Sequence, residues 1–167
     1  FWESPTRPWF LVIPLSGSPI AVIPEIGEKL FKKTFVKDIH TWPSPNLNGD
    51  DISPLKSLLE SLPSRFGAIG AELGKEMSIR MPVLDLSLLQ DNFKFDIVDG
   101  ASLIWSLRII KTLNEIKKIE KAAQIVSEVF SILPTFISAN DSERDVAKKL
   151  KKEILKRGVD NIPYLPV

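Results

Sequence analysis

Residues 107–123 read Leu-Arg-Ile-Ile-Lys-Thr-Leu-Asn-Glu-Ile-Lys-Lys-Ile-Glu-Lys-Ala-Ala, and they join a strand-rich first part of the chain to a helical end. Thr112 and Glu115 have the spacing of a capping box, in which each side chain satisfies the other residue's backbone amide. Apolar residues then recur at intervals of three and four, at Ile116, Ile119, Ala123, Val126 and Phe130. The stretch therefore predicts where a long helix begins and which of its sides faces a core.

A second helix is predicted after the first. Pro134 ends or kinks the first helix because proline lacks a backbone N–H. Ser142 is the next cap candidate, with Asp145 three residues later, and Gly158 supplies the left-handed residue that closes the helix. The apolar side of this second helix consists of residues four apart, Val146, Leu150 and Ile154.

The residues before this junction alternate short β-branched runs with helical patterns. Strands are predicted at 9–14, 20–24, 39–42, 65–73 and 93–98, and helices at 27–35, 53–62 and 81–89. The first two strands are separated by Ser-Gly-Ser-Pro, which predicts a hairpin. Gly67 and Gly70, inside the fourth strand pattern, indicate the close approach of another backbone. This order predicts a mixed α/β sheet covered by helices.

Composition excludes several classes of function. The 167 residues suffice for one domain and part of another, and the net charge of +1 gives no electrostatic reason to expect nucleic acid or a membrane as partner. Without cysteine the chain has no disulfide and no thiolate site, which fits a cytoplasmic protein. With His40 as the single histidine, a zinc site built from several histidines is excluded. Because the first residue is not Met, we expect the chain to begin inside a longer protein.

The opening Phe-Trp-Glu-Ser-Pro-Thr-Arg-Pro-Trp-Phe is the best candidate for a binding loop. Prolines restrict its conformations, and an arginine held in place, Arg7, is a good bidentate clamp for a carboxylate. Trp2 and Trp9 are candidates for the walls of a pocket. The alternative is a strand-entry loop whose aromatic residues simply cover the sheet. His40 is interpreted as an ordinary residue at the end of a strand.

Three segments, taken in order, resemble a known family. They are Arg7-Pro-Trp-Phe-Leu-Val-Ile-Pro14 with Ile20-Ala-Val-Ile-Pro24, Phe66-Gly-Ala-Ile-Gly-Ala-Glu-Leu-Gly74 with Phe95-Asp-Ile-Val-Asp-Gly-Ala-Ser-Leu-Ile104, and Leu107-Arg-Ile-Ile-Lys-Thr-Leu-Asn-Glu-Ile116. The set resembles the creatinase/Xaa-Pro aminopeptidase, or pita-bread, metallopeptidases, in which Arg-x-x-Lys-[Ser/Thr]-x-x-Glu-Ile opens the catalytic domain.

The resemblance implies a fold and a division into domains. Residues 1–106 would be a creatinase-like N-terminal domain, a mixed sheet with flanking helices that lacks its first strand and helix. Residues 107–167 would be the first two helices of an incomplete pita-bread α+β catalytic domain. The stripe from Ile116 to Phe130 would then be exposed for want of its partner sheet, so we expect the chain to self-associate or to be marginally stable.

The resemblance also implies an activity that this chain lacks by itself. The whole protein would be a dimeric hydrolase with two divalent metal ions, Mn, Co or Zn, and a peptide or small amide as substrate. No catalytic residue and no metal ligand of the family can be carried over to this chain. One substrate-binding residue can be carried over, because Arg7 matches a creatinase arginine that holds the substrate carboxylate from the neighbouring subunit. Trp2 would line the same pocket.

Four hypotheses for the function remain open. The first is the substrate-recognition and dimerisation part of a hydrolase resembling Xaa-Pro aminopeptidase or proline dipeptidase. The second is a creatinase-like or ectoine-hydrolase-like enzyme that cleaves a C–N bond in a small molecule. The third is a non-catalytic binding module with the same fold. The fourth is an unrelated α/β domain that binds a small molecule.

Overall fold

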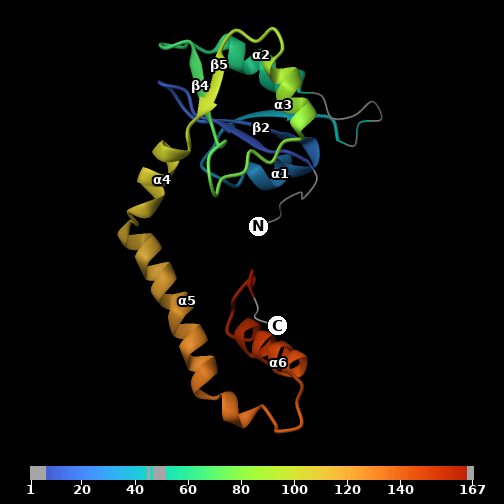
Figure 1. Cartoon of the computed structure of the whole chain (residues 1–167), viewed down its shortest axis with the longest axis vertical. Coiled ribbons are helices and arrows are strands. Elements are labelled where there is room, and N and C mark those ends of the chain that lie inside the picture. Colours follow the sequence, from blue (N-terminus) through green and yellow to red (C-terminus); the bar gives the residue numbers. More distant parts are fainter. Residues whose placement is uncertain (1–6, 45, 47–51, 165–167) are drawn as a thin grey trace. The chain divides into compact units, whose positions relative to one another are not determined.

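The structure is a computed structural model that describes residues 7–44, 46 and 52–164. The chain forms two compact units, Phe1–Ser106 and Leu107–Val167. The strands, all in the first unit, are β1 (Phe10–Val12), β2 (Ile20–Pro24), β3 (Asp38–Trp42), β4 (Ala68–Ala71) and β5 (Asp96–Asp99). The helices are η1 (Glu25–Gly27), α1 (Glu28–Phe31), α2 (Ser53–Ser61), α3 (Val83–Gln90), α4 (Ala101–Ile109), α5 (Leu113–Ser131), η2 (Leu133–Thr135) and α6 (Glu143–Leu155) (Figure 1).

Strand β2 is the centre of the first unit. It is the middle strand of a three-stranded sheet, antiparallel to β1 and parallel to β3, so the predicted hairpin is confirmed. Its side chains alternate between the two faces of the sheet. Val22 packs with Leu55 of α2 on one face, while Ala21 and Ile23 pack with Val36 on the other. Figure 1 shows α1 on one side of β2 and both α2 and α3 on the other. All five residues of β2 are consequently buried.

The prediction of a single sheet is wrong for the described residues. Strands β4 and β5 pair in parallel with each other and form a separate two-stranded sheet. Ile69 of β4 and Ile97 of β5 nevertheless pack against the same core cluster as Val22. The second sheet is therefore joined to the first through apolar side chains, where main-chain ladder hydrogen bonds were expected.

The two glycines of the fourth strand pattern have different roles. A Cβ atom added to Gly100 would lie 3.4 Å from the Cα atom of Gly70, so these backbones approach closely, as predicted for Gly70. Gly67 has open space around it and a φ of +67°. This left-handed conformation favours glycine and belongs to a turn, which explains why β4 begins one residue later than Gly67.

Both predicted capping boxes of the second unit are present. At the start of α5, Thr112 Oγ1 accepts from the Glu115 amide at 3.3 Å, and Glu115 Oε2 accepts from the Thr112 amide at 2.8 Å. Ser142 and Asp145 form the same arrangement at the start of α6, with both distances 3.2 Å. Gly158 closes the end of α6 with a φ of +82°, as predicted.

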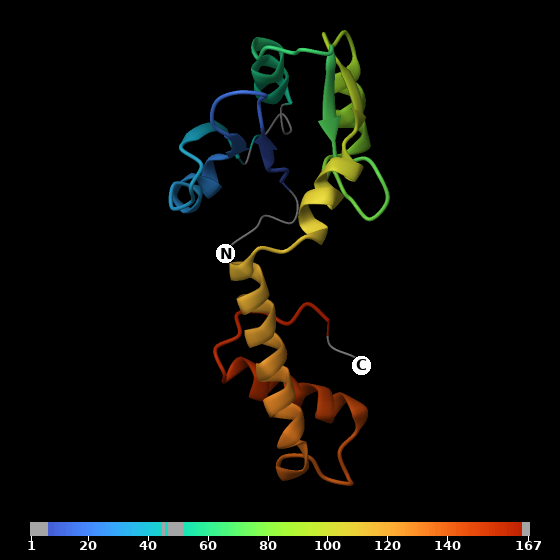
Figure 2. The ribbon, with the colours of Figure 1, turned by 90° about the vertical axis from the view of Figure 1, so that its left-hand side faces the viewer.

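The side of α5 that packs is not the one predicted to face a core. The buried residues are Ile125 and Val129, which contact Leu150 and Ile154 of α6. The predicted stripe, which we call the α5 seam, consists of Ile116, Ile119, Ala123, Val126 and Phe130, and all of it is exposed. At 100° per residue the two sets lie roughly a third of a turn apart. Figure 2 shows α6 behind α5. The contacts of α6 with α5 are therefore on one side of α5. The expected exposure of the stripe is confirmed.

The carboxylates of the two capping boxes are held in their charged form. Hydrogen bonds from the amide and hydroxyl of Thr112 lower the pKa of Glu115 below its ordinary value. The hydroxyl of Ser142, followed by its amide, does the same to the pKa of Asp145. Each helix thus gains a negative charge at the positive end of its dipole.

Two further carboxyl groups of the second unit have a lowered pKa because they pair with lysines. The Lys149 ammonium, 2.6 Å from Asp141 Oδ2, lowers the pKa of Asp141. Lys156 lies 2.6 Å from Glu153 Oε1 and lowers the pKa of Glu153. These pairs hold the loop before α6 and the last turn of α6.

In the part of the chain that the structure describes, no helix is both long enough and apolar enough to span a lipid bilayer.

The first prediction concerns the central strand. Ile23 is fully buried and Ile13 is 74% exposed, so the same substitution at the two positions is a matched pair. Ile23→Ala removes buried contacts and is expected to lower the free energy of unfolding by about 2–5 kcal/mol. Ile13→Ala is expected to change it by less than about 0.5 kcal/mol. All four tryptophans lie in the first unit, so urea unfolding followed by tryptophan fluorescence measures the effect. Equal losses for both variants would contradict the central position of β2.

The second prediction concerns acid. A carboxylate whose pKa is lowered in the folded state stabilises the fold above its ordinary pKa, and this contribution is lost as the pH falls through the lowered value. The helices of the second unit are therefore expected to melt at lower temperature as the pH drops below about 4. The variant Glu115→Gln with Asp145→Asn should melt earlier at pH 7 and lose less between pH 7 and pH 3, as followed by far-UV circular dichroism.

The control for the acid experiment is Glu120→Gln, which changes an exposed glutamate on the same helix outside the capping boxes. We expect its melting temperature at pH 7, and its loss between pH 7 and pH 3, to match those of the unchanged chain. A capping-box variant that behaves like this control would show that the boxes carry no stabilisation.

Candidate functional site

The predicted binding residues lie where the chain enters β1. Arg7 is half-buried, and Pro8 after it is buried. Successive residues of an extended chain point to opposite sides, so Pro8 and Phe10 share one side and Trp9 lies on the other. Trp2, the other predicted substrate-binding residue, falls outside the described residues.

Trp9 does not line the same surface as its neighbours. Its ring makes an edge-to-face contact with Phe31, with 5.5 Å between ring centroids and 61° between planes. A Cβ atom on Gly27 would lie 2.7 Å from the Trp9 ring, so this glycine is what lets the indole fit. Trp9 is therefore not a pocket wall, and it fits the alternative prediction that the aromatic residues of this loop cover the sheet, because the indole packs against the buried cluster of Ala21, Ile23 and Val36.

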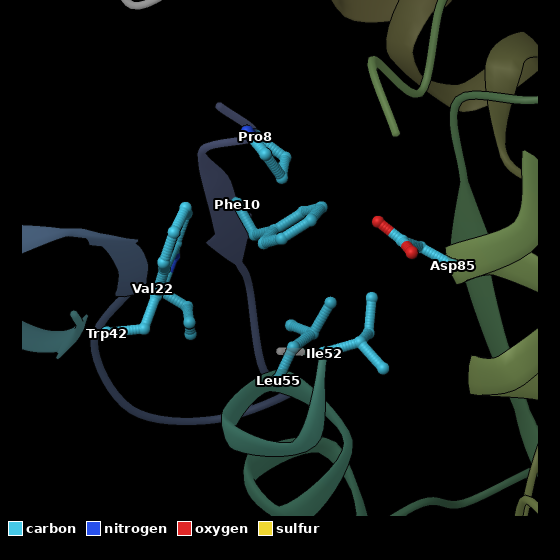
Figure 3. A pocket seen from close by; sticks show the side chains of 7 residues that line it. All are labelled: Pro8, Phe10, Val22, Trp42, Ile52, Leu55 and Asp85. Carbon is cyan, nitrogen blue, oxygen red and sulfur yellow. The ribbon is translucent and has the colours of Figure 1, made fainter. Parts of the chain in front are cut away.

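A small recess opens on the other side of β1. Its lining is mostly apolar and comes from β1, β2, β3, α2, α3 and the residues just before β1 and α2: Pro8, Phe10, Val22, Trp42, Ile52, Leu55 and Asp85. Figure 3 shows the carboxylate of Asp85 turned towards Phe10 across the recess from the remaining side chains. The recess is partly open to solvent, and its volume of about 10 Å³ is enough for about one water molecule. A whole dipeptide does not fit in it.

The described lining of this recess contains no pair of catalytic groups. Asp85 is half-buried and is the only charged residue among those lining the recess. No described lining residue pairs with it as a nucleophile and base or as an acid and base. None of the carboxyl groups whose pKa is lowered lies here, since all four are in the second unit. Arg7 precedes the lining residue Pro8 in the chain and is not itself one of the lining residues.

The single histidine has a local role. His40 Nε2 lies 3.1 Å from Asp38 Oδ1, and both side chains are about half exposed. The two residues are on the same face of β3 because they are two positions apart. His40 does not line the recess, and it lies in the middle of β3, where the sequence predicted the end of a strand.

Within residues 7–44, 46 and 52–164, no group of three or more His, Asp or Glu side chains is placed to hold a metal ion. The family's pair of divalent metals therefore does not fit the residues described here.

The recess contains residues that the sequence did not single out. The sequence could have indicated Phe10, because Phe10 is two positions from Pro8 in an extended run and therefore points to the same side of the strand as Pro8. No sequence pattern indicates Trp42 or Asp85 as lining residues, because they reach the recess from separate elements, 32 and 75 positions beyond Phe10.

The chain was compared with protein-family models and with curated proteins. No family model matches the chain. The probable dipeptidases PepE of Mycobacterium tuberculosis and Mycobacterium bovis are 24% identical to it over 157 residues, which cover 94% of this chain and 40% of theirs. The chain thus spans about 40% of the length of these curated relatives.

Solved structures agree with this match. The prolidase of Thermococcus sibiricus is 23% identical, with a TM-score of 0.76 over 96% of this chain and 42% of the prolidase. The Xaa-Pro dipeptidase of Bacillus anthracis is 19% identical, with a TM-score of 0.70 over 96% of this chain and 41% of the dipeptidase. The described chain therefore has the fold of part of the prolidases and Xaa-Pro dipeptidases, and its resemblance to the creatinase/Xaa-Pro aminopeptidase family is confirmed at the level of the fold.

Proposed function

We propose that this chain is the substrate-recognition and dimerisation part of a hydrolase that cleaves Xaa-Pro dipeptides, and that it is not catalytic alone. The observation that carries the proposal is the match to prolidases and an Xaa-Pro dipeptidase over nearly all of this chain but only about two fifths of theirs.

The division into domains is part of the proposal. We assign residues 1–106 to a creatinase-like N-terminal domain and residues 107–167 to the first two helices of the pita-bread catalytic domain. The boundary between the two compact units, which lies at Ser106 and Leu107, supports this assignment. The capping box at Thr112 supports it as well, because it starts a new helix directly after the junction.

We assign the metal chemistry to the whole protein. Two divalent ions, Mn, Co or Zn, would polarise the scissile carbonyl and activate water there. The described residues of this chain contain no cluster of ligands for them. In the proposal, their ligands are residues outside the described ones, and this chain contributes to binding and positioning the substrate.

Arg7 is the residue proposed to hold the substrate carboxylate. Its guanidinium is suited to bidentate pairing, and Pro8 after it has a fixed φ that limits the conformations of the loop. In the proposal Arg7 acts on substrate bound to the neighbouring subunit, so the working unit is a homodimer. Trp2 would wall the same pocket.

Peptide cleavage is favoured over C–N bond hydrolysis in a small molecule. The relatives reported above are described as prolidases and dipeptidases, and none of them as a creatinase or an ectoine hydrolase. The absence of cysteine supports a cytoplasmic location for the proposed enzyme.

The third prediction tests the role of Arg7 in the longest natural product of the gene. Arg7→Ala removes a charge-assisted clamp and is expected to raise the KM for an Xaa-Pro dipeptide about 10- to 100-fold, with a smaller effect on kcat. The same variant should leave the KM for the corresponding dipeptide amide unchanged, because the amide lacks the carboxylate. Proline release measures the first substrate and prolinamide release the second.

The matched control is Arg65→Ala, which removes an exposed arginine that lies over the Phe66 ring, 5.3 Å from its centroid. It should change neither KM. An equal rise in KM for the dipeptide and its amide would contradict the role of Arg7. A natural product that hydrolyses no Xaa-Pro dipeptide but binds a protein stoichiometrically would favour the non-catalytic module instead.

A further inference from the structure

Gly27 is a buried glycine whose backbone conformation does not require glycine. It is the last residue of η1 and directly precedes α1, with φ −91° and ψ −12°. Most residues adopt this right-handed conformation in turns. The reason for glycine at this position is therefore space: an added Cβ atom would lie 2.7 Å from Cζ2 and 2.9 Å from Cη2 of the Trp9 indole.

The indole of Trp9 cannot simply turn away from a side chain at position 27. Its ring contacts Phe31 edge to face and packs against the buried cluster that contains Ile23. The ring is rigid, and these contacts occupy the space into which it would have to rotate. A methyl group added to Gly27 is therefore expected to move the ring as a whole and to shift the main chain at Trp9.

The main chain at Trp9 leads directly to Arg7, the residue proposed to hold the substrate carboxylate. The ladder between β1 and β2 begins at Phe10, so residues 7–9 lie outside it. Pro8 stands between Arg7 and Trp9, and its φ is fixed by the ring. Few torsions are left between these two residues to absorb a displacement of Trp9, so the displacement reaches Arg7.

We propose that Gly27 is a positioning residue for Arg7. By leaving room for the indole, Gly27 determines where the chain enters β1 and hence where the Arg7 guanidinium meets the substrate carboxylate. A bidentate pair depends on orientation as well as distance, so a small displacement weakens it. The inference rests on the proposed function and adds to it a residue 20 positions beyond Arg7.

The test is Gly27→Ala in the longest natural product of the gene, assayed beside Arg7→Ala. We expect Gly27→Ala to raise the KM for an Xaa-Pro dipeptide about 3- to 10-fold and to change kcat less than about 2-fold. The KM for the corresponding dipeptide amide should stay unchanged, because the amide has no carboxylate for Arg7 to hold. A loss of folded enzyme would instead lower the activity towards both substrates equally, and that result would contradict the positioning role.

Trp9→Phe provides a rescue. Phenylalanine lacks the outer ring of the indole, which contains Cζ2 and Cη2, so the clash in Gly27→Ala is relieved. The variant with both substitutions should therefore have a lower dipeptide KM than Gly27→Ala alone. An equal or higher KM would overturn the proposal, since the indole would not be what transmits the effect.

The matched control is Gly70→Ala, the same substitution at another glycine of the first unit. A Cβ atom on Gly70 would lie 3.6 Å from the Cα atom of Gly100, which is an ordinary van der Waals contact. This variant should change neither KM. A rise in its dipeptide KM alone would mean that the effect does not depend on the contact with Trp9, and would also overturn the proposal.

The failure of the inference can be told from the failure of the proposed function. If Arg7→Ala raises the dipeptide KM selectively and folded Gly27→Ala does not, only the positioning role of Gly27 is wrong. If Arg7→Ala has no selective effect, or if the unchanged product releases neither proline nor prolinamide, the proposed function is wrong and the inference with it.

A second variant covers the case in which Gly27→Ala does not fold, as judged by urea unfolding followed by tryptophan fluorescence. Phe31→Leu removes the edge-to-face contact that holds the indole and adds no clash. It is expected to raise the dipeptide KM and to leave the amide KM unchanged. An unchanged dipeptide KM in this variant would overturn the proposal.

Discussion

The burial of β2 on both faces and both edges is the constraint on which the first unit depends. Its backbone groups are paired to β1 on one side and to β3 on the other. Val22 and Ile23 point to opposite faces and are almost completely buried, each contributing about 1.5–3 kcal/mol of apolar transfer. β1 and β3 pair with that strand, and side chains of α2 and α3 pack against one of its faces. The recess depends on the same pairing, since β1 pairs with β2 and so brings Phe10 beside Val22.

The second unit follows a different rule, because its stability depends on helix ends and one small contact. The two capping boxes satisfy amides that would otherwise lack partners, and Ile125, Val129, Leu150 and Ile154 form its buried cluster. A helix of 19 residues with only two buried side chains leaves much apolar surface to water. This imbalance distinguishes α5 from β2, which is buried along its whole length.

Local features were predictable from sequence wherever the interaction is local. The hairpin of β1 and β2, both capping boxes and the closing glycine at Gly158 each depend on residues a few positions apart, and all are present. The side of α5 that packs was not predictable in this way. Both sides are apolar, and the choice depends on where α6 returns. The division of five strands between two sheets was missed as well, because strand patterns do not specify their partners.

The candidate site shows the same limit. Arg7 and Pro8 stand out in a short, proline-rich loop, and the resemblance of the ordered segments to one family was visible without a structure. By itself the sequence determined the elements, their caps and the family likeness, since these are encoded within short spans or in the order of motifs. Only the tertiary structure decided that Trp9 packs under α1 while Phe10, Trp42 and Asp85 meet in a recess. Contacts between distant elements are set by how sheets and helices pack, and no local pattern records them.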